Sequence, residues 1–277
     1  MSSVEASQQR NWNSLAVTEL FSVAIQTSYD DDDHWNAISA LHKKGGKDVL
    51  HQALDLTRNA DPKLRTIGID ILGQLGLPER TYPKECLKTA IELATNDTAP
   101  EVLHAAAIAL NHLKDPRGTP PLVRLADHPL ADVRYAAALA LGGRCEPEAI
   151  ATLIRLTRDS SDLVRDWAVF GIGQIGPVDT PEVREALFRR LDDSDRQTRY
   201  EAISGLARCG DIRGIPPLIA ALTAEPQNYE LWIPADSFLK RVGAEPEADK
   251  ADEGPDAETL VTALRRLLAQ HDEQRAE

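Results

Sequence analysis

The sequence predicts an all-α fold, a right-handed α-solenoid of about seven stacked helical pairs with a helical cap at each end. A similar segment recurs along the chain, and its copies carry apolar residues at the spacing of an amphipathic helix. No stretch alternates apolar and polar residues over the length of a strand between hairpin turns. We therefore expect a helical repeat array with essentially no sheet.

The repeat is clearest in four segments, with two weaker copies at 31–45 and 98–115. The four are DPKLRTIGIDILGQLG at 61–76, PLADVRYAAALALGGR at 129–144, SDLVRDWAVFGIGQIG at 161–176 and DRQTRYEAISGLARCG at 195–210. One column of the alignment holds an arginine in each clear copy, namely Arg65, Arg134, Arg165 and Arg199. His34 and Leu103 occupy this column in the weaker copies, and its members recur about every 31–38 residues, an interval typical of repeat arrays.

Each copy predicts two helices. Val133, Ala137, Ala140 and Leu141 fall at i, i+4, i+7 and i+8, which is the apolar stripe of an amphipathic first helix. A glycine-rich or charged turn follows, and a second periodic run begins, as at 147–158, where Pro147 suits the first turn of a helix. One such pair cannot bury its apolar stripe alone, so neighbouring pairs must stack.

The repeat also sets the expected domain boundaries. Residues 1–30 are predicted to form an N-terminal tail and a capping helix, the latter near 14–27. Residues 31–224 form the solenoid, and residues 225–277 form a divergent C-terminal helical pair. The proline- and acid-rich stretch near 244–256 has the composition of a flexible connection.

Composition limits the classes of partner and the compartment. The formal net charge is −13, so the average surface repels phosphate backbones and anionic lipid headgroups. Three widely spaced cysteines, Cys86, Cys145 and Cys209, argue against a disulfide framework or a zinc site. The chain has neither a signal-peptide pattern nor a run of eighteen apolar residues. We expect a cytoplasmic protein that binds neither membranes nor, in general, nucleic acid.

The pattern D-x-x-V-R-x-x-A-x-x-x-L-G, most specific at 132–134 and 164–165, resembles the HEAT repeat in the variant named after phycobilisome lyases, over roughly residues 31–224. In that family an aspartate six positions before the column arginine pairs across neighbouring repeats. Asp159 precedes Arg165, and Asp193 precedes Arg199, by this interval. The resemblance implies that these residues, with Arg65 and Arg134, order a stack of HEAT-like pairs and are not a binding site. Leu103 stands in the arginine column of the copy at 98–115, so the series of arginine–aspartate contacts is predicted to be interrupted there.

The order and spacing of DDDDHWNAISALHKKGGKDVLHQAL, IGIDILGQLG, DLVRDWAVFGIGQIG and TRYEAISGLA are also similar to HEAT-repeat immunity proteins encoded beside Rhs polymorphic toxins in bacteria. This resemblance implies that the protein neutralises a toxin by binding it directly. The acidic balance of the chain suits a basic toxin domain. The sequence does not fix the oligomeric state.

Catalytic motifs are absent from the sequence. It contains no phosphate-binding loop, no H-E-x-x-H and no G-x-S-x-G. The seven histidines are scattered, none is followed by glutamate, and each is predicted to be an ordinary surface or helix-end residue. We therefore predict no catalytic, cofactor or metal site, and a protein that is not an enzyme. The main alternative is a bilin lyase-like protein that handles a chromophore, because that family shares the repeat.

Nucleic-acid binding is the weaker alternative. It would need a basic groove on the second helices, where Arg155, Arg158, Arg184, Arg189 and Arg190 could cluster. Several acidic residues occupy the same predicted helices, so a solvated face of mixed charge is the simpler interpretation. Arg155 and Arg184 are retained as candidate partner contacts.

The column immediately after the arginine position supplies the other candidates. Tyr135 lies two residues after Val133, about 200° round the helix, so this column is predicted to face away from the core. Aromatic side chains recurring there could anchor a partner, or could pack over the neighbouring repeat. The candidates are Trp35, His104, Tyr135 and Tyr200, together with Tyr229 and Trp232 in the divergent C-terminal segment.

Overall fold

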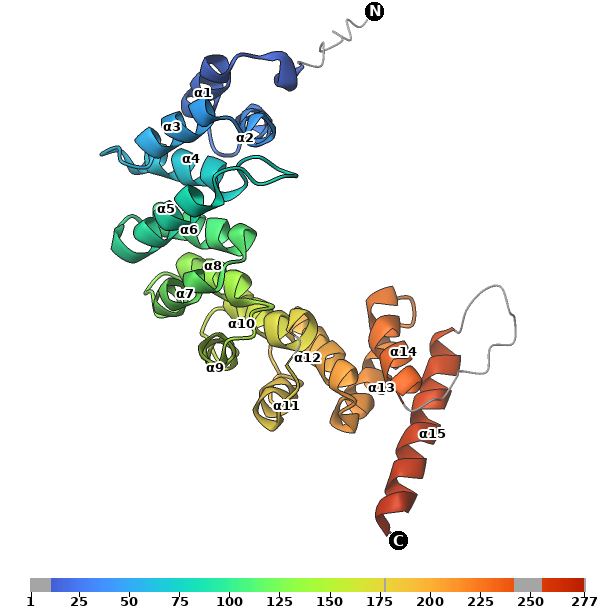
Figure 1. The fold of residues 1–277 in the computed structure, drawn as a ribbon. Coiled ribbons are helices and arrows are strands. Elements are labelled where there is room, and N and C mark those ends of the chain that lie inside the picture. Colours follow the sequence, from blue (N-terminus) through green and yellow to red (C-terminus); the bar gives the residue numbers. More distant parts are fainter. Residues whose placement is uncertain (1–10, 177, 242–255, 277) are drawn as a thin grey trace, which may run out of the picture. The chain divides into compact units, whose positions relative to one another are not determined.

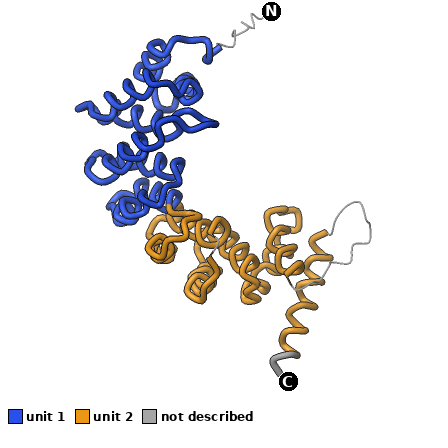
Figure 2. The backbone as a smooth tube through the Cα atoms, viewed as in Figure 1, with its two compact units in different colours: residues 1–140 blue, residues 141–277 orange. Residues whose placement is uncertain are grey.

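The computed structural model describes residues 11–176, 178–241 and 256–276. Within these residues there are fifteen α-helices and no strand (Figure 1). The chain divides into two compact units, unit 1 comprising residues 1–140 and unit 2 residues 141–277 (Figure 2). Apart from Asp256, the connection predicted near 244–256 lies outside the described residues.

Unit 1 contains the first eight α-helices. They are α1 (Val17–Gln26), α2 (Asp32–Lys44), α3 (Lys47–Leu56), α4 (Pro62–Gly73), α5 (Pro83–Asn96), α6 (Pro100–Leu113), α7 (Thr119–Leu125) and α8 (Ala131–Leu141), which ends at the unit boundary. The short 3₁₀ helices η1 (Trp12–Ser14) and η2 (Pro116–Gly118) precede α1 and α7. Helices α2, α4 and α6 pack in sequence, α3 packs on α4, and α5 packs on α4 and α6 (Figure 1).

The starts of these helices follow from local chemistry. Asp61 caps α4 because its carboxylate accepts the Lys63 N–H at 2.9 Å, while Pro62 occupies the first turn without a donor to lose. Asp31 caps α2 in the same way through the Asp33 N–H. Helix α2 then ends at Gly45, whose φ of 55° is the left-handed conformation that glycine tolerates. The repeat thus encodes its own helix boundaries.

Unit 2 continues with seven α-helices. They are α9 (Pro147–Leu156), α10 (Asp162–Phe170), α11 (Pro181–Phe188), α12 (Arg196–Cys209), α13 (Ile215–Ala224), α14 (Trp232–Arg241) and α15 (Ala257–Ala276). A π-helical turn, η3 (Gly171–Ile175), follows α10, and the 3₁₀ helices η4 (Ile212–Gly214) and η5 (Tyr229–Leu231) precede α13 and α14. Helices α10, α12 and α14 pack in order as one row, and α9 packs on α11 in the other.

The core is made of small and branched aliphatic side chains. Val133, Ala137, Ala140 and Leu141 are all buried, as their helical spacing predicts. Close helix packing is evident in both units: a Cβ on Gly68 of α4 would come within 2.7 Å of the Ala53 carbonyl oxygen, and one on Gly205 of α12 within 2.8 Å of the Gly173 Cα in η3. Within the described residues, no helix is both long and apolar enough to cross a membrane.

Candidate functional site

The column arginines make contacts between consecutive repeats. Arg165 of α10 donates from Nε and Nη2 to the two carboxylate oxygens of Asp193, at 2.9 and 2.8 Å. Arg65 of α4 makes the same bidentate contact with Asp97, at 2.7 and 2.9 Å. Both aspartates lie just before the column helix of the next repeat, and their side chains are almost fully buried. This geometry orients helices and leaves little of either pair for a ligand.

The other column positions are also occupied in structural contacts. Arg134 donates from Nη1 to the carbonyls of His128 and Pro129, and Arg199 donates to those of Asp193 and Ser194. Arg165 likewise donates from Nη1 to the carbonyl of Asp159. Leu103 is buried and provides no guanidinium, so the arginine column is interrupted there.

The column after the arginine differs in exposure from repeat to repeat. Trp35 is 41% exposed, and its indole N–H donates to the Tyr29 carbonyl at 2.9 Å. His104 and Tyr135 are half-buried, with ring centroids 6.0 Å apart. Tyr200 is half-buried and donates to Glu225 at 3.0 Å. Thr66, in the same column, is buried. The column therefore combines packing over the next repeat with a single well-exposed aromatic residue, Trp35.

The second-helix arginines do not gather into a basic groove. Arg184 of α11 is paired with Asp179 at 2.6 Å, Arg189 with Glu185 at 2.9 Å and Arg190 with Asp193 at 3.1 Å. Arg155 is exposed on α9, in the row opposite α10 and α12. Acidic partners thus offset most of this positive charge, which gives a face of mixed charge.

The C-terminal aromatic residues form an exposed pair in unit 2. Tyr229 of η5 is 65% exposed, Trp232 of α14 is half-buried, and their ring centroids are 4.7 Å apart. Ile233 beside them is 68% exposed, whereas Phe238, one and a half turns further along α14, belongs to the core. We call Tyr229 and Trp232 the aromatic pair.

Three carboxylates of unit 2 have no cation among their described contacts, and the one in η5 lies next to Tyr229 along the chain. They are Asp166 of α10, Glu201 of α12 and Glu230 of η5, here called the carboxylate cluster. Burial, followed by the charges of Glu201 and Asp195, raises the pKa of Asp166 to about 6. Burial, with the nearby Glu230 charge, raises the pKa of Glu201. Asp166 also has a buried carboxylate oxygen with no hydrogen-bond partner. The cluster is therefore under mutual repulsion.

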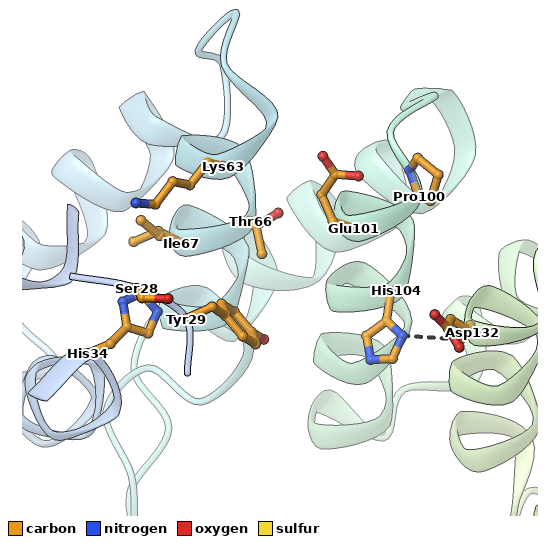
Figure 3. A pocket seen from close by; sticks show the side chains of 10 residues that line it. All are labelled: Ser28, Tyr29, His34, Lys63, Thr66, Ile67, Pro100, Glu101, His104 and Asp132. Carbon is orange, nitrogen blue, oxygen red and sulfur yellow. Dashed lines mark hydrogen bonds between the residues drawn. The ribbon is translucent and has the colours of Figure 1, made fainter. Parts of the chain in front are cut away.

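Unit 1 contains a groove of about 700 Å³ (Figure 3). Its lining comes from the α1–α2 turn and from α2, α4, α6 and α8. It includes Tyr29, His34, Lys63, Thr66, Glu101 and His104. Figure 3 shows the Thr66 hydroxyl directed into the space between α4 and α6, with the Tyr29 ring below it. None of the predicted partner contacts except His104 lines this groove.

The floor of the groove holds buried polar atoms without partners. His34 is 0% exposed, its Nδ1 lies 2.9 Å from the Ala24 carbonyl, and its Nε2 has no partner. Burial lowers the pKa of His34, so the ring is neutral near pH 7. Thr66 is 7% exposed, and its hydroxyl is also unpartnered. His34 lies in the first turn of α2 and His42 in its last turn, the helix-end positions that were predicted, but both side chains are buried.

One turn beyond Thr66, Asp70 carries a carboxyl whose pKa burial raises to about 7. The Tyr29 hydroxyl lies beside this carboxyl, and the pKa of Tyr29 is raised by burial and by the Asp70 charge. Sequence reasoning missed Tyr29, Thr66 and Asp70 as a group. Two departures from the repeat pattern mark this region in the sequence. A histidine replaces arginine in the column at position 34, and an aspartate interrupts the apolar run IGIDILG.

Among the described residues, no three His, Cys, Asp or Glu side chains are grouped so that they could hold a metal ion. The groove and the carboxylate cluster present hydrogen-bonding and charged groups. Both kinds of surface suit recognition of another molecule.

The two-row packing and the arginine–aspartate contacts define the class of protein. Residues 87–173 and 155–231 match the family of HEAT repeats, and together these segments cover just over half of the chain. The chain belongs to the HEAT-repeat family, and the predicted all-α solenoid fold is confirmed.

The chain is similar to the protein YibA of Escherichia coli K12, with 29% identity over 194 residues, covering 66% of this chain and 68% of YibA. The X-ray structure of E. coli YibA has the same fold, with a TM-score of 0.68 and 23% identity, covering 92% of this chain and 93% of that one. The complex of CpcE and CpcF of phycocyanin lyase from Nostoc sp. PCC7120 is also similar in fold. Its TM-score is 0.51 at 20% identity, covering 96% of this chain and all of that one.

Proposed function

We propose that this protein is a non-catalytic scaffold that binds another protein, and that the surface bound is basic. The observation that carries the proposal is the carboxylate cluster of unit 2, one member of which, Glu230, lies in η5 with Tyr229 of the exposed aromatic pair. Tyrosine and tryptophan are favoured anchors at protein interfaces, since they bury a large area at a low cost in side-chain entropy. The HEAT-repeat fold presents such side chains along successive helices.

Electrostatics support a basic partner. The raised pKa of Asp166 and of Glu201 means that each carboxylate ionises against burial and neighbouring negative charge. A lysine or arginine brought into the cluster would offset that repulsion. The net charge of −13 would also speed the approach of a basic protein and disfavour acidic ones.

The finer proposal is that the protein neutralises a basic toxin domain by direct binding. Its support is the resemblance of the repeat segments to immunity proteins encoded beside Rhs toxins, together with this acidic and aromatic surface. Neutralisation would then need no chemistry by this chain. A partner bound across α10, α12 and α14 would have its own basic active surface covered.

The test is an affinity pull-down from the native cell, with the tagged wild-type chain compared with a double variant. The variant combines Glu201→Gln, which removes the charge and keeps one acceptor oxygen for Gln197 or Gln174, and Tyr229→Ala, which removes an exposed ring. We expect a basic protein to co-purify in stoichiometric amount with wild type, and its affinity for the purified variant to fall about tenfold or more. The matched control is Glu92→Gln, at an exposed glutamate of unit 1.

An acidic partner, or equal affinity for the variant and the control, would contradict the proposal. The bilin-handling alternative predicts a bound chromophore instead. Mixing the purified chain with candidate bilins would then induce a change in visible absorbance. A stoichiometric basic protein without such a change supports binding in place of chromophore handling.

A further inference from the structure

We infer that the groove of unit 1 is a second binding site, and that it takes the guanidinium group of an arginine presented by a partner polypeptide. The inference goes beyond the proposed function, because the groove is built from residues other than the carboxylate cluster and the aromatic pair. It relies on the proposed function only for the source of the arginine.

The unpartnered atoms on the groove floor select a donor. The Ala24 carbonyl can only accept, so the neutral His34 ring donates to it from Nδ1 and leaves Nε2 as a lone-pair acceptor. The Thr66 hydroxyl, also free of a partner, can accept as well. Buried polar atoms in proteins are nearly always hydrogen-bonded. Two unpartnered acceptors that line one groove are therefore complementary to a ligand with N–H donors.

The charges at the rim select a cation. Glu101 and Asp132 are exposed, and neither carboxylate forms an ion pair within the described part of the chain. Lys63 lines the groove, but its ammonium already donates to the carbonyls of Ile25 and Thr27, where α1 ends. Arg65, whose charge interacts with Glu101, is bound to Asp97. An anion would face these carboxylates as well as the two acceptors. A cationic donor complements both.

The shape of the groove favours guanidinium over ammonium. The Tyr29 ring, Ile67 and Pro100 provide apolar walls, and Tyr29 is 44% exposed. A guanidinium is flat, stacks on an aromatic face and carries five N–H donors along its edges. It can therefore lie on Tyr29 and reach acceptors on two sides, whereas a compact ammonium has only three donors radiating from one point.

Tyr29 controls access to the floor of the groove. It lies in the turn between α1 and α2, outside any helix, and its ring packs on His34 with a centroid separation of 5.4 Å. The two orphan atoms are closed to water in this arrangement. The entering guanidinium displaces the Tyr29 ring sideways and then stacks on it. Trp35, which meets Tyr29 edge-on at 4.7 Å, reports this movement through its fluorescence.

The experiment titrates the full-length protein with the tripeptide acetyl-Gly-Arg-Gly-amide. Matched peptides carry lysine or citrulline, the latter having nearly the shape of arginine without its charge. We expect the arginine peptide to bind about tenfold more tightly than the citrulline peptide and several-fold more tightly than the lysine peptide. NMR shifts in the residues that line the groove and a change in tryptophan fluorescence should accompany saturation. Equal binding of citrulline, or no saturable binding of arginine, would overturn the inference.

Two valine substitutions provide a matched comparison. Thr66→Val removes the orphan hydroxyl of the groove and keeps the side-chain shape. Thr198→Val does the same at a fully buried, equally unpartnered threonine of α12 in unit 2. Both variants should fold, since removing an unpaired hydroxyl leaves no polar atom stranded. Thr66→Val should weaken arginine-peptide binding about fivefold or more, and Thr198→Val should leave it unchanged. The same affinity in both variants would refute the assigned contact.

A charge variant separates this site from the proposed function. Glu101→Gln should weaken the arginine peptide several-fold at low salt and have less effect at high salt. Glu201→Gln in unit 2 should leave peptide binding unaltered. If the basic-partner proposal fails while the peptide still binds with these responses, the groove stands on its own. If the peptide fails while a basic protein still depends on Glu201 and Tyr229, only the groove inference is lost.

Discussion

Thr66 in unit 1 and Asp166 in unit 2 occupy the same position of the repeat, one residue after a column arginine that makes a bidentate contact with an aspartate. Their surroundings differ sharply. Thr66 lies on the floor of a groove beside the Tyr29 ring, among acceptors that have no donors. Asp166 lies near Glu201 in the carboxylate cluster, where the pKa of both these carboxyls is raised. The repeat thus fixes the backbone and leaves each unit free to present a different surface.

The largest expected difference concerns the arginine–aspartate contacts. Asp97 has Arg65 as its only cationic partner within the described residues, while Asp193 is contacted by both Arg165 and Arg190. Removing one partner of a buried pair leaves an uncompensated charge, so Arg65→Ala should lower the free energy of unfolding by about 3–4 kcal/mol. Arg165→Ala should cost about 2 kcal/mol, since Arg190 remains. Urea denaturation measures both.

Arg58→Ala is the control for that comparison, because Arg58 forms only an exposed contact with Asp55 at 3.9 Å. Its effect should stay below about 0.5 kcal/mol. A loss for Arg165→Ala as large as that for Arg65→Ala would show that Arg190 does not compensate Asp193.

The second prediction concerns pH and the two buried carboxyls. In the fold the pKa of Asp70 is about 7, well above the value of an unfolded aspartate, so the native state holds this proton more tightly. Its contribution to stability is therefore present at low pH and is lost as the pH rises from about 4 to about 7. Asp70→Asn removes this loss. The gain in the free energy of unfolding of the variant over wild type should therefore be about 2 kcal/mol larger at pH 8 than at pH 5.

Asp166→Asn is the counterpart in unit 2. The pKa of Asp166 is about 6 and its side chain is half-buried. Asp166→Asn should therefore also stabilise the protein at pH 8 relative to pH 5, but by a smaller amount, about 1 kcal/mol after solvent screening. Thermal melts of wild type and both variants from pH 5 to 8 test the pair. A gain for either variant that is independent of pH would contradict the assigned titration.

The last prediction concerns helix packing. Gly205→Ala in unit 2 would place a Cβ 2.8 Å from the Gly173 backbone, whereas Gly73→Ala in unit 1 would place it 3.1 Å from Ala109. Overpacking outweighs the better helix propensity of alanine only in the tighter case. We expect Gly205→Ala to destabilise by about 1–2 kcal/mol and Gly73→Ala to be within about 0.5 kcal/mol of neutral. Equal effects in denaturant melts would show that the two interfaces adapt alike.

Sequence reasoning identified the fold because its evidence is regular. The apolar stripe from Val133 to Leu141 is buried as expected, and the Arg165–Asp193 contact links residues that the repeat alignment places in adjacent copies. The aromatic candidates were less uniform. Tyr229 is exposed, yet His104 and Tyr135 pack on each other, because the neighbouring repeat covers part of each ring.

The sequence by itself determined the helical pairs, their caps and the column arginines, since all of these follow from helical periodicity and from the chemistry of single turns. Only the tertiary structure decided which polar groups are left without partners. His34, Thr66 and Asp70 come from two helices, and Tyr29 lies over them from a turn that no periodicity describes. Likewise, Glu201 comes near Asp166 on one side and Glu230 on the other only after α12 has packed against α10 and α14. Burial and charge act over distances of a few ångströms in space, and sequence spacing does not specify those distances.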